Sequence, residues 1–194
     1  MDMTMKNIDT ANNKSLIFLS KLKSLLRDTS AVSAVEFALI APLLVSIYLG
    51  AAETTVGVSI NRKVSRVAST VSDLVAQAQS ISAADIDSIL NVSAAVMAPT
   101  DDAPLRIIVT GVNIDSNKNA TVLWSRAKNA SKAATGSTYP IPTSIKIANS
   151  FIVVAQVQYD FSPGFGGAIV GPLLFDKKNY LRPRVGSNVT CTGC

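Results

Sequence analysis

The residues with the most reactive chemistry in this sequence are two cysteines, Cys191 and Cys194, spaced as C-x-x-C. Such a pair could exchange disulfides, bind a metal or close a local disulfide. A thioredoxin-like redox pair opens a helix after a strand, whereas this pair ends the chain. Tetrahedral zinc needs four ligands, and the sequence has neither a second cysteine pair nor any histidine. On the residues alone, a local disulfide and a free or intersubunit pair both remain open.

The other polar residues do not have the spacing of a catalytic or ligand-binding site. Without histidine the chain lacks the commonest general base, metal ligand and pH switch. The acids Asp85, Asp87, Asp101 and Asp102 lack the D-x-D-x-D-G spacing of a calcium loop, and GFGGAIVG lacks the lysine of a phosphate loop. The net charge is only +5, and the basic residues form no stripe for nucleic acid. We predict a protein that is not an enzyme, with no catalytic residues, cofactor, metal, nucleic acid or small-molecule substrate.

One acid lies in an unusual place, because Glu36 is near the start of the apolar run AVSAVEFALIAPLLVSIYLGAAE. The uncharged residues 37–52 that follow it correspond to about 24 Å of helix. With its flanks the run reaches the roughly 30 Å of a hydrocarbon core, so we predict a transmembrane helix over 31–60. Glu53 is then expected near the far headgroups, where it would tolerate substitution. A secretory signal peptide is the alternative, but the run starts late and contains a carboxylate.

The rest of the chain predicts an α+β fold, in which a long N-terminal transmembrane helix and a short second helix precede a small antiparallel β-sheet. Apolar residues continue past the span at alternating spacings of four and three: Ile60, Val64, Val67, Val71, Leu74 and Ala78. This seam predicts that the helix continues to about Gln79, buried on its own domain or, as an alternative, in a coiled coil. Ser82 is expected to cap the second helix, which runs to about Met97 with Asp85 in its first turn.

From residue 101 onward the pattern is typical of strands separated by turns. LRIIVTGVNI and ATVLWSR flank the turn formers DSNKN and predict a hairpin, while FIVVAQVQYDF is the strongest strand. GSTYPIPTS and SPGFGGAIVGP predict loops. NYLRPRVGSNVTC is expected to form an edge strand, since Pro183 cannot donate to a ladder. The sheet is therefore predicted to have about four strands.

Two parts of the chain resemble the TadE/TadG-like family of bacterial tight-adherence (Tad) pilus assembly proteins. The first, AVSAVEFALIAPLL after a basic stretch, also resembles type IV pilins; the second comprises VLWSRA, VAQVQYDFSPGFG and YLRPRVGSNVTCTGC. The resemblance implies a pilin-like fold and a membrane-anchored minor pilin-like protein that takes part in assembly of a tight-adherence type IV (Flp) pilus. It implies one span in the bacterial inner membrane, with the N-terminus cytoplasmic and the sheet domain periplasmic.

The resemblance also implies roles for single residues. In these families a prepilin peptidase is thought to cut before the apolar helix, so that glutamate becomes the fifth residue, which places the cut between Ala31 and Val32. Glycine usually precedes such a cut, and here Ala31 takes its place. Glu36 can then pair with the new α-amino group of a neighbouring subunit, which registers the helices; a tolerated interfacial acid is the alternative. An extracytoplasmic domain favours a disulfide between Cys191 and Cys194.

These expectations divide the chain into a cytoplasmic basic leader (1–30), a transmembrane helix (31–60), a helical extension with the second helix (61–100) and an extracytoplasmic β domain (101–194). The expected partners are the membrane, other pilin-like proteins and the Tad secretion system. One alternative is a single-pass envelope scaffold that binds the secretion machinery without entering a filament. Another is a membrane-tethered hydrolase or thiol oxidoreductase, which a redox titration of the cysteines would distinguish.

Overall fold

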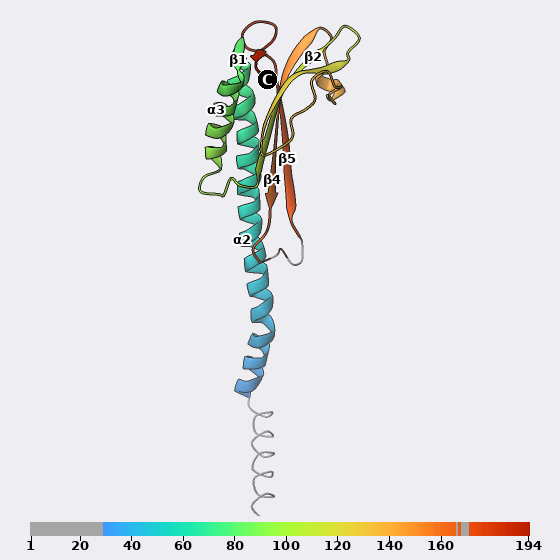
Figure 1. Ribbon diagram of the computed structural model, residues 1–194. Helices are drawn as coiled ribbons and strands as arrows, with labels where there is room; N and C mark the ends of the chain where they lie inside the picture. The colour runs from blue at the N-terminus through green and yellow to red at the C-terminus, as the bar shows by residue number, and fades with distance from the viewer. Residues whose placement is uncertain (1–28, 166, 168–170) are drawn as a thin grey trace, which may run out of the picture. The chain divides into compact units, whose positions relative to one another are not determined.

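The structure, a computed structural model, describes residues 29–165, 167 and 171–194 (Figure 1). The leader expected over residues 1–30 lies almost wholly outside the described residues. The chain divides into two compact units, residues 1–51 and 52–194, and each is described by itself.

The order of elements confirms the α+β class. The helices are α2 (Thr29–Ala76), α3 (Ala83–Ala94) and the short 3-10 turns η1 (Ala95–Met97) and η2 (Thr143–Ile145). The strands are β1 (Ser80–Ser82), β2 (Leu105–Ile114), β3 (Ala120–Lys128), β4 (Ser150–Phe161), β5 (Leu173–Leu181) and β6 (Thr190–Thr192). The predicted second helix, hairpin and central strand are therefore all present.

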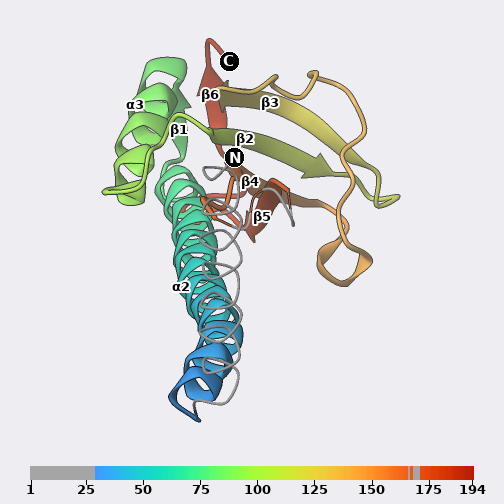
Figure 2. The same cartoon turned by 90° about the horizontal axis from the view of Figure 1, so that it is seen from below.

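A four-stranded antiparallel sheet forms the centre of the second unit, as the sequence predicts. Its strand order is β3-β2-β4-β5, so the predicted hairpin, β2 and β3, occupies one side, and β4 pairs with the whole length of β2 (Figure 2). β2 and β4 each have a neighbour on both sides, and their mostly buried, β-branched residues suit that central position.

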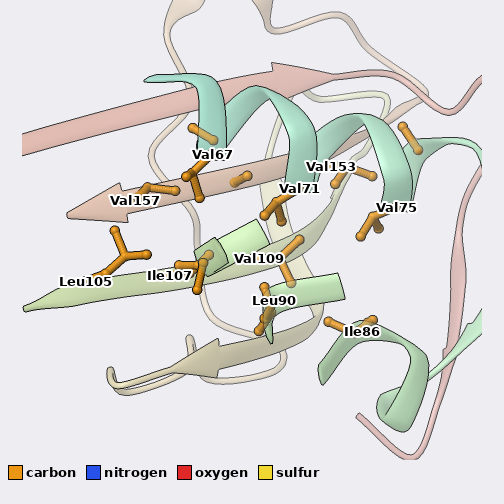
Figure 3. Close-up of a cluster of buried hydrophobic side chains, with 14 of the residues drawn as sticks. Val67, Val71, Val75, Ile86, Leu90, Leu105, Ile107, Val109, Val153 and Val157 are labelled. Atoms are coloured by element: carbon orange, nitrogen blue, oxygen red, sulfur yellow. The ribbon is translucent and has the colours of Figure 1, made fainter. Parts of the chain in front are cut away.

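The part of α2 in the second unit packs on this sheet through its apolar seam. Seven hydrophobic residues of α2 form the buried side of this seam: Ile60, Val64, Val67, Ala68, Val71, Val75 and Ala76. They meet sheet residues that include Ile107, Val109, Val153 and Val157 (Figure 3). The seam is thus covered by the chain's own sheet, which leaves no free face for the coiled-coil alternative.

The predicted heptad spacing of the seam is wrong at its C-terminal end. Leu74 is 38% exposed, and Val75 takes the buried position instead. A straight helix drifts by about 20° per heptad, so a strict seven-residue repeat leaves the buried face within a few turns. The helix ends at Ala76, slightly before the expected Gln79.

α3 begins where the sequence predicts, at a capping box. The Ser82 hydroxyl accepts a hydrogen bond from the Asp85 amide at 3.2 Å, and the Asp85 carboxylate accepts one from the Ser82 amide at 3.2 Å. Hydrogen bonds from the Ser82 side chain and then its backbone lower the pKa of Asp85. Ile86 and Leu90 point from this helix into the core (Figure 3).

The C-terminal tail does not form the single edge strand predicted for it. The edge strand is β5, which begins at Leu173 and ends before Pro183. The chain then returns to the end of α2, where the Arg184 amide donates to the Ala76 carbonyl at 2.8 Å. β6 pairs in parallel with β1, a two-stranded sheet that the sequence did not predict (Figure 2). Three-residue strands carry too few alternating positions to be recognised.

A close approach between β2 and β3 fixes the position of the only tryptophan, Trp124. The register shifts between Gly111 and Val112, and a Cβ placed on Gly111 would lie 2.3 Å from the Trp124 ring and 2.8 Å from that of Phe151. Only glycine fits at this position. The Trp124 ring nitrogen donates to the Val189 carbonyl at 2.8 Å, so the same contact holds the tail against the sheet.

Candidate assembly helix and C-terminal tail

In the first unit, the described residues present an exposed apolar helical surface. Between Val32 and Tyr48, the large apolar side chains of α2 are 45% to 73% exposed. The most apolar stretch of the helix Val32–Ala76 has a mean hydropathy of 2.1 and no buried residue. Among the described residues this is the one helix whose length and composition would let it cross a membrane. Lipid or other apolar helices must cover such a surface.

Pro42 lies inside this apolar helix without ending it. Proline has no amide hydrogen, so the carbonyl of Ala38 loses its helical donor. The Ser46 hydroxyl donates to the Pro42 carbonyl at 2.7 Å, which keeps that hydroxyl satisfied within the helix. A bilayer core offers no water for such groups, and both features suit a helix buried in lipid.

The predicted processing and registration residues all lie on the N-terminal turns of α2. Ala31 and Val32 are adjacent, and Glu36 follows Val32 by one helical turn, which places these two side chains on the same face. Val32 is 63% exposed, and Glu36 is also exposed. The carboxylate is therefore accessible to a group from another molecule.

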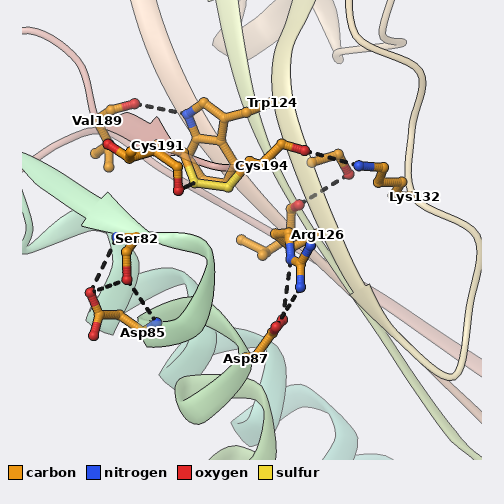
Figure 4. Close-up of a disulfide and its surroundings, with 12 residues drawn as sticks. Ser82, Asp85, Asp87, Trp124, Arg126, Lys132, Val189, Cys191 and Cys194 are labelled. Carbon is orange, nitrogen blue, oxygen red and sulfur yellow. Dashed lines mark hydrogen bonds and ion pairs between the residues drawn. A yellow bond between two sulfur atoms is a disulfide. The ribbon is translucent and has the colours of Figure 1, made fainter.

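The two cysteines lie in the second unit, whereas Glu36 lies in the first. Their Cα atoms are 5.8 Å apart, a disulfide-bonding distance, and Figure 4 shows the sulfurs joined. Both residues are half-buried against the core. The Lys132 ammonium donates to the Cys194 carbonyl at 2.9 Å. The pair thus sits in a tail that β6, Trp124 and Lys132 already hold in place.

Charged residues that could have suggested a metal site are engaged in structural contacts instead. Asp85 caps α3, and Asp87 pairs with Arg126, which ties α3 to β3 (Figure 4). Asp102 approaches Lys128 at 3.9 Å. Within the described residues no three potential metal ligands lie close enough together to hold an ion.

Glu53 makes a contact for which the sequence contains no local signal. Its carboxylate accepts a hydrogen bond from the Phe165 amide, a partner 112 positions away. Glu53 also lines an apolar groove of about 300 Å³ with Gly57, Phe161 and Phe175 among the other lining residues. Glu53 therefore takes part in the packing of the second unit, and its expected place near the far headgroups stays a prediction.

The long exposed apolar helix and the α+β domain point to a protein anchored by a single membrane span. Residues 31–73 match the family model described as TadE-like protein, which confirms the resemblance drawn from AVSAVEFALIAPLL. No curated protein and no solved structure matches the chain. The TadE-like family is associated with Tad pilus assembly.

Proposed function

We propose that this chain is a membrane-anchored minor pilin-like protein that takes part in assembly of a bacterial tight-adherence type IV (Flp) pilus. The observation that carries the proposal is the exposed apolar part of α2, which begins at Val32, contains Glu36 and falls inside the TadE-like match. Its mechanism is association rather than catalysis. The apolar helix packs in the membrane or at the pilus base, and the sheet domain contacts partners.

Glu36 supplies the registration in this proposal. Removing an ion from water into a low-dielectric setting costs several kcal/mol unless it is paired. A carboxylate on an exposed helix face can be paired only by a group from outside that surface, and the new α-amino group of a neighbouring pilin-like chain has the required charge. Two ions that lipid disfavours would then neutralise each other, and they would do so at one relative height of the two helices.

The proposed topology has one span in the bacterial inner membrane, with the leader (1–30) in the cytoplasm and residues beyond 60 in the periplasm. The helical extension (61–100) and the β domain (101–194) would then both meet an oxidising compartment. A disulfide between Cys191 and Cys194 is part of this proposal, because such bonds persist in the periplasm and are rare in the cytoplasm. A reporter enzyme fused after Cys194 should be active only in the periplasm.

Processing by a prepilin peptidase between Ala31 and Val32 would convert the chain to its filament-competent form. Mass spectrometry of the N-terminus in the native host tests this directly. A chain that begins at Val32 supports filament entry. An intact leader favours the second candidate, an envelope scaffold that binds the secretion machinery. The feature that supports this candidate is Ala31, which stands where glycine usually precedes the cut.

Deletion and complementation test the function as a whole. A host strain that lacks this chain should lose Tad pili and surface attachment, and the wild-type gene should restore both. The Glu36→Gln gene should restore membrane-bound protein but not pili. Normal piliation of the deletion strain would contradict the proposal.

A further inference from the structure

The apolar run of α2 is shorter than a bilayer core, and this shortfall has a structural consequence. Residues 37–52 supply about 24 Å of uncharged helix against a core of roughly 30 Å. If Glu36 lies at the inner boundary, the core extends to about Val56. Glu53 then lies inside the outer part of the apolar layer, where an ion needs a partner.

The partner of Glu53 comes from its own unit, residues 52–194. The Glu53 carboxylate accepts the amide hydrogen of Phe165, from the segment that follows β4. One turn later, a Cβ placed on Gly57 would lie 3.4 Å from the Phe161 ring and 3.9 Å from the Phe175 ring, so the sheet meets the helix closely here. The C-terminal end of β4 and the N-terminal end of β5 therefore lie beside helix residues 53–57.

Apolar side chains gather at this level without cover from the described chain. Phe165 is 73% exposed, and Leu173 and Leu174 at the start of β5 are 40% and 54% exposed. Beside them, the stacked rings of Phe161 and Phe175, 5.8 Å between centroids, line the groove of about 300 Å³. A water-exposed protein surface rarely places so many large apolar groups together.

We propose that this end of the sheet, Phe165 with Leu173 and Leu174, lies in the outer interface of the bilayer, and that lipid acyl chains fill the groove beside Glu53. The inference rests on the membrane span but goes beyond the pilus function. The occupant is lipid because the covalent continuity of α2 fixes the level of these residues at the end of the apolar run. The exposed Arg62, about 7.5 Å further along the helix than Gly57, then reaches the lipid phosphates.

The surface so defined sets the depth of the helix. Without it, a short span would slide or tilt to match the bilayer. With this surface in place, side chains from the sheet extend the apolar layer on one side of the helix. The Phe165 amide in the same surface donates the hydrogen bond that Glu53 needs inside that layer. Glu53 acts as a positioning residue that holds Phe165 at the interface.

Tryptophan emission in bromolipid vesicles tests the placement on the full chain. Phe165→Trp and Leu174→Trp are each compared with Leu123→Trp, on the opposite edge strand β3, and Val45→Trp, in the span; the buried native Trp124 gives a constant background. Phosphatidylcholine brominated near the glycerol end should quench roughly half of the emission added at 165 and 174, as expected for groups 5–10 Å into the boundary. The same lipid should not quench the emission added by Leu123→Trp. Lipid brominated near the methyl end of its acyl chains should quench the emission added by Val45→Trp.

The outcomes separate this inference from its premise. Quenching at 45 with none at 165 and 174 would overturn the interface while the span stands. No quenching at any position would overturn the span and the inference together. A photoreactive residue at 165 that captures protein instead of phospholipid would show that a partner chain occupies the surface, and would also overturn the inference.

A second pair of variants tests the role of Glu53. In the Phe165→Trp background, Glu53→Gln keeps a carbonyl oxygen that can accept the amide hydrogen, whereas Glu53→Ala removes it. Quenching at 165 should persist in the first variant and fall by more than half in the second. Equal quenching in both would show that Glu53 does not position Phe165.

Discussion

The two parts of α2 are built from the same apolar residue types, yet they differ in what covers them. Between residues 60 and 76 the seam is buried, and Val64, Val67 and Val71 have no exposed surface. Between residues 32 and 48 the large side chains stay exposed, with Leu39 at 73%. Apolar surface of this size is costly in water. The first part therefore presents an apolar surface that the described residues leave exposed and that suits contact with lipid or other helices, whereas the second part packs on its own sheet.

A charge introduced into each part of α2 should give the largest difference in folding between the two parts. Val71→Asp places an unpaired ion in the core, which costs several kcal/mol and should unfold the sheet domain. Leu44→Asp makes the same change in the exposed part. It should leave the sheet domain folded and oppose insertion by about 2.5 to 3.5 kcal/mol near midspan. Circular dichroism in detergent and a membrane-extraction assay measure the two effects. Equal loss of folding in both variants would contradict the comparison.

Glycine-to-alanine substitutions in the two units should give a smaller difference in the free energy of unfolding. Gly111→Ala forces the Trp124 ring from its place and should weaken its hydrogen bond to Val189, with a loss of about 1 to 3 kcal/mol or more. Gly50→Ala is the matched control, because beyond the backbone of its own helix turn and its chain neighbours the added Cβ meets nothing within 4 Å. It should be neutral or stabilise the helix by up to about 1 kcal/mol. Urea unfolding followed by tryptophan emission gives both values, and an unchanged Gly111→Ala midpoint would rule out the steric account.

The cysteine pair should matter less than the contacts around it. Thiol labelling of the native protein should fail until a reductant is added. Changing Cys191 and Cys194 together to serine should cost less than about 2 kcal/mol, because the ring is small and closes little chain. Complete loss of folding would mean that these cysteines form longer-range bonds than the structure shows. Rapid thiol exchange would favour the oxidoreductase alternative.

The smallest effect concerns alkaline pH. Burial, followed by the nearby Tyr180 and Asp176, raises the pKa of Tyr139 to about 12. The folded form therefore keeps a proton that the unfolded chain loses above about pH 10. The contribution of Tyr139 to stability should be constant below pH 10 and fall between pH 10 and 12. Tyr139→Phe should flatten that part of the unfolding profile, and an unchanged profile would assign the fall to other groups.

The sequence predicts those features whose signals are local. The S-x-x-D pattern at Ser82 gave the start of α3, turn formers between apolar runs gave the β2–β3 hairpin, and the apolar run at 31–53 gave the candidate span. The apolar seam of α2 was also predicted, but the residue buried at its C-terminal end was not, because the drift of a straight helix places Val75 in the core instead of Leu74. Local spacing therefore predicts that a helix forms, whereas packing determines which of its residues are buried.

Contacts between distant positions could not be read from the chain. The pairing of β6 with β1 and the contact between Glu53 and Phe165 each join segments about 110 positions apart. Neither has a local pattern, since three-residue strands and a single acid at the end of an apolar run are compatible with many partners. For the same reason the assembly role of Glu36 is a prediction from a family motif, whereas the groove beside Glu53 is visible only in the structure.

Crosslinking from the exposed part of α2 tests the central claim most directly. A photoreactive residue at Leu39 in the native membrane should capture partner pilin-like helices in the wild type. Glu36→Gln should reduce capture sharply, since an unpaired amine on the partner costs several kcal/mol in a low-dielectric setting, while membrane insertion stays intact. Glu53→Gln, which keeps an acceptor for Phe165, is the matched control and should behave as wild type. Equal capture by the wild type and Glu36→Gln would show that the glutamate is a tolerated interfacial acid and that the pilin-like mechanism is wrong.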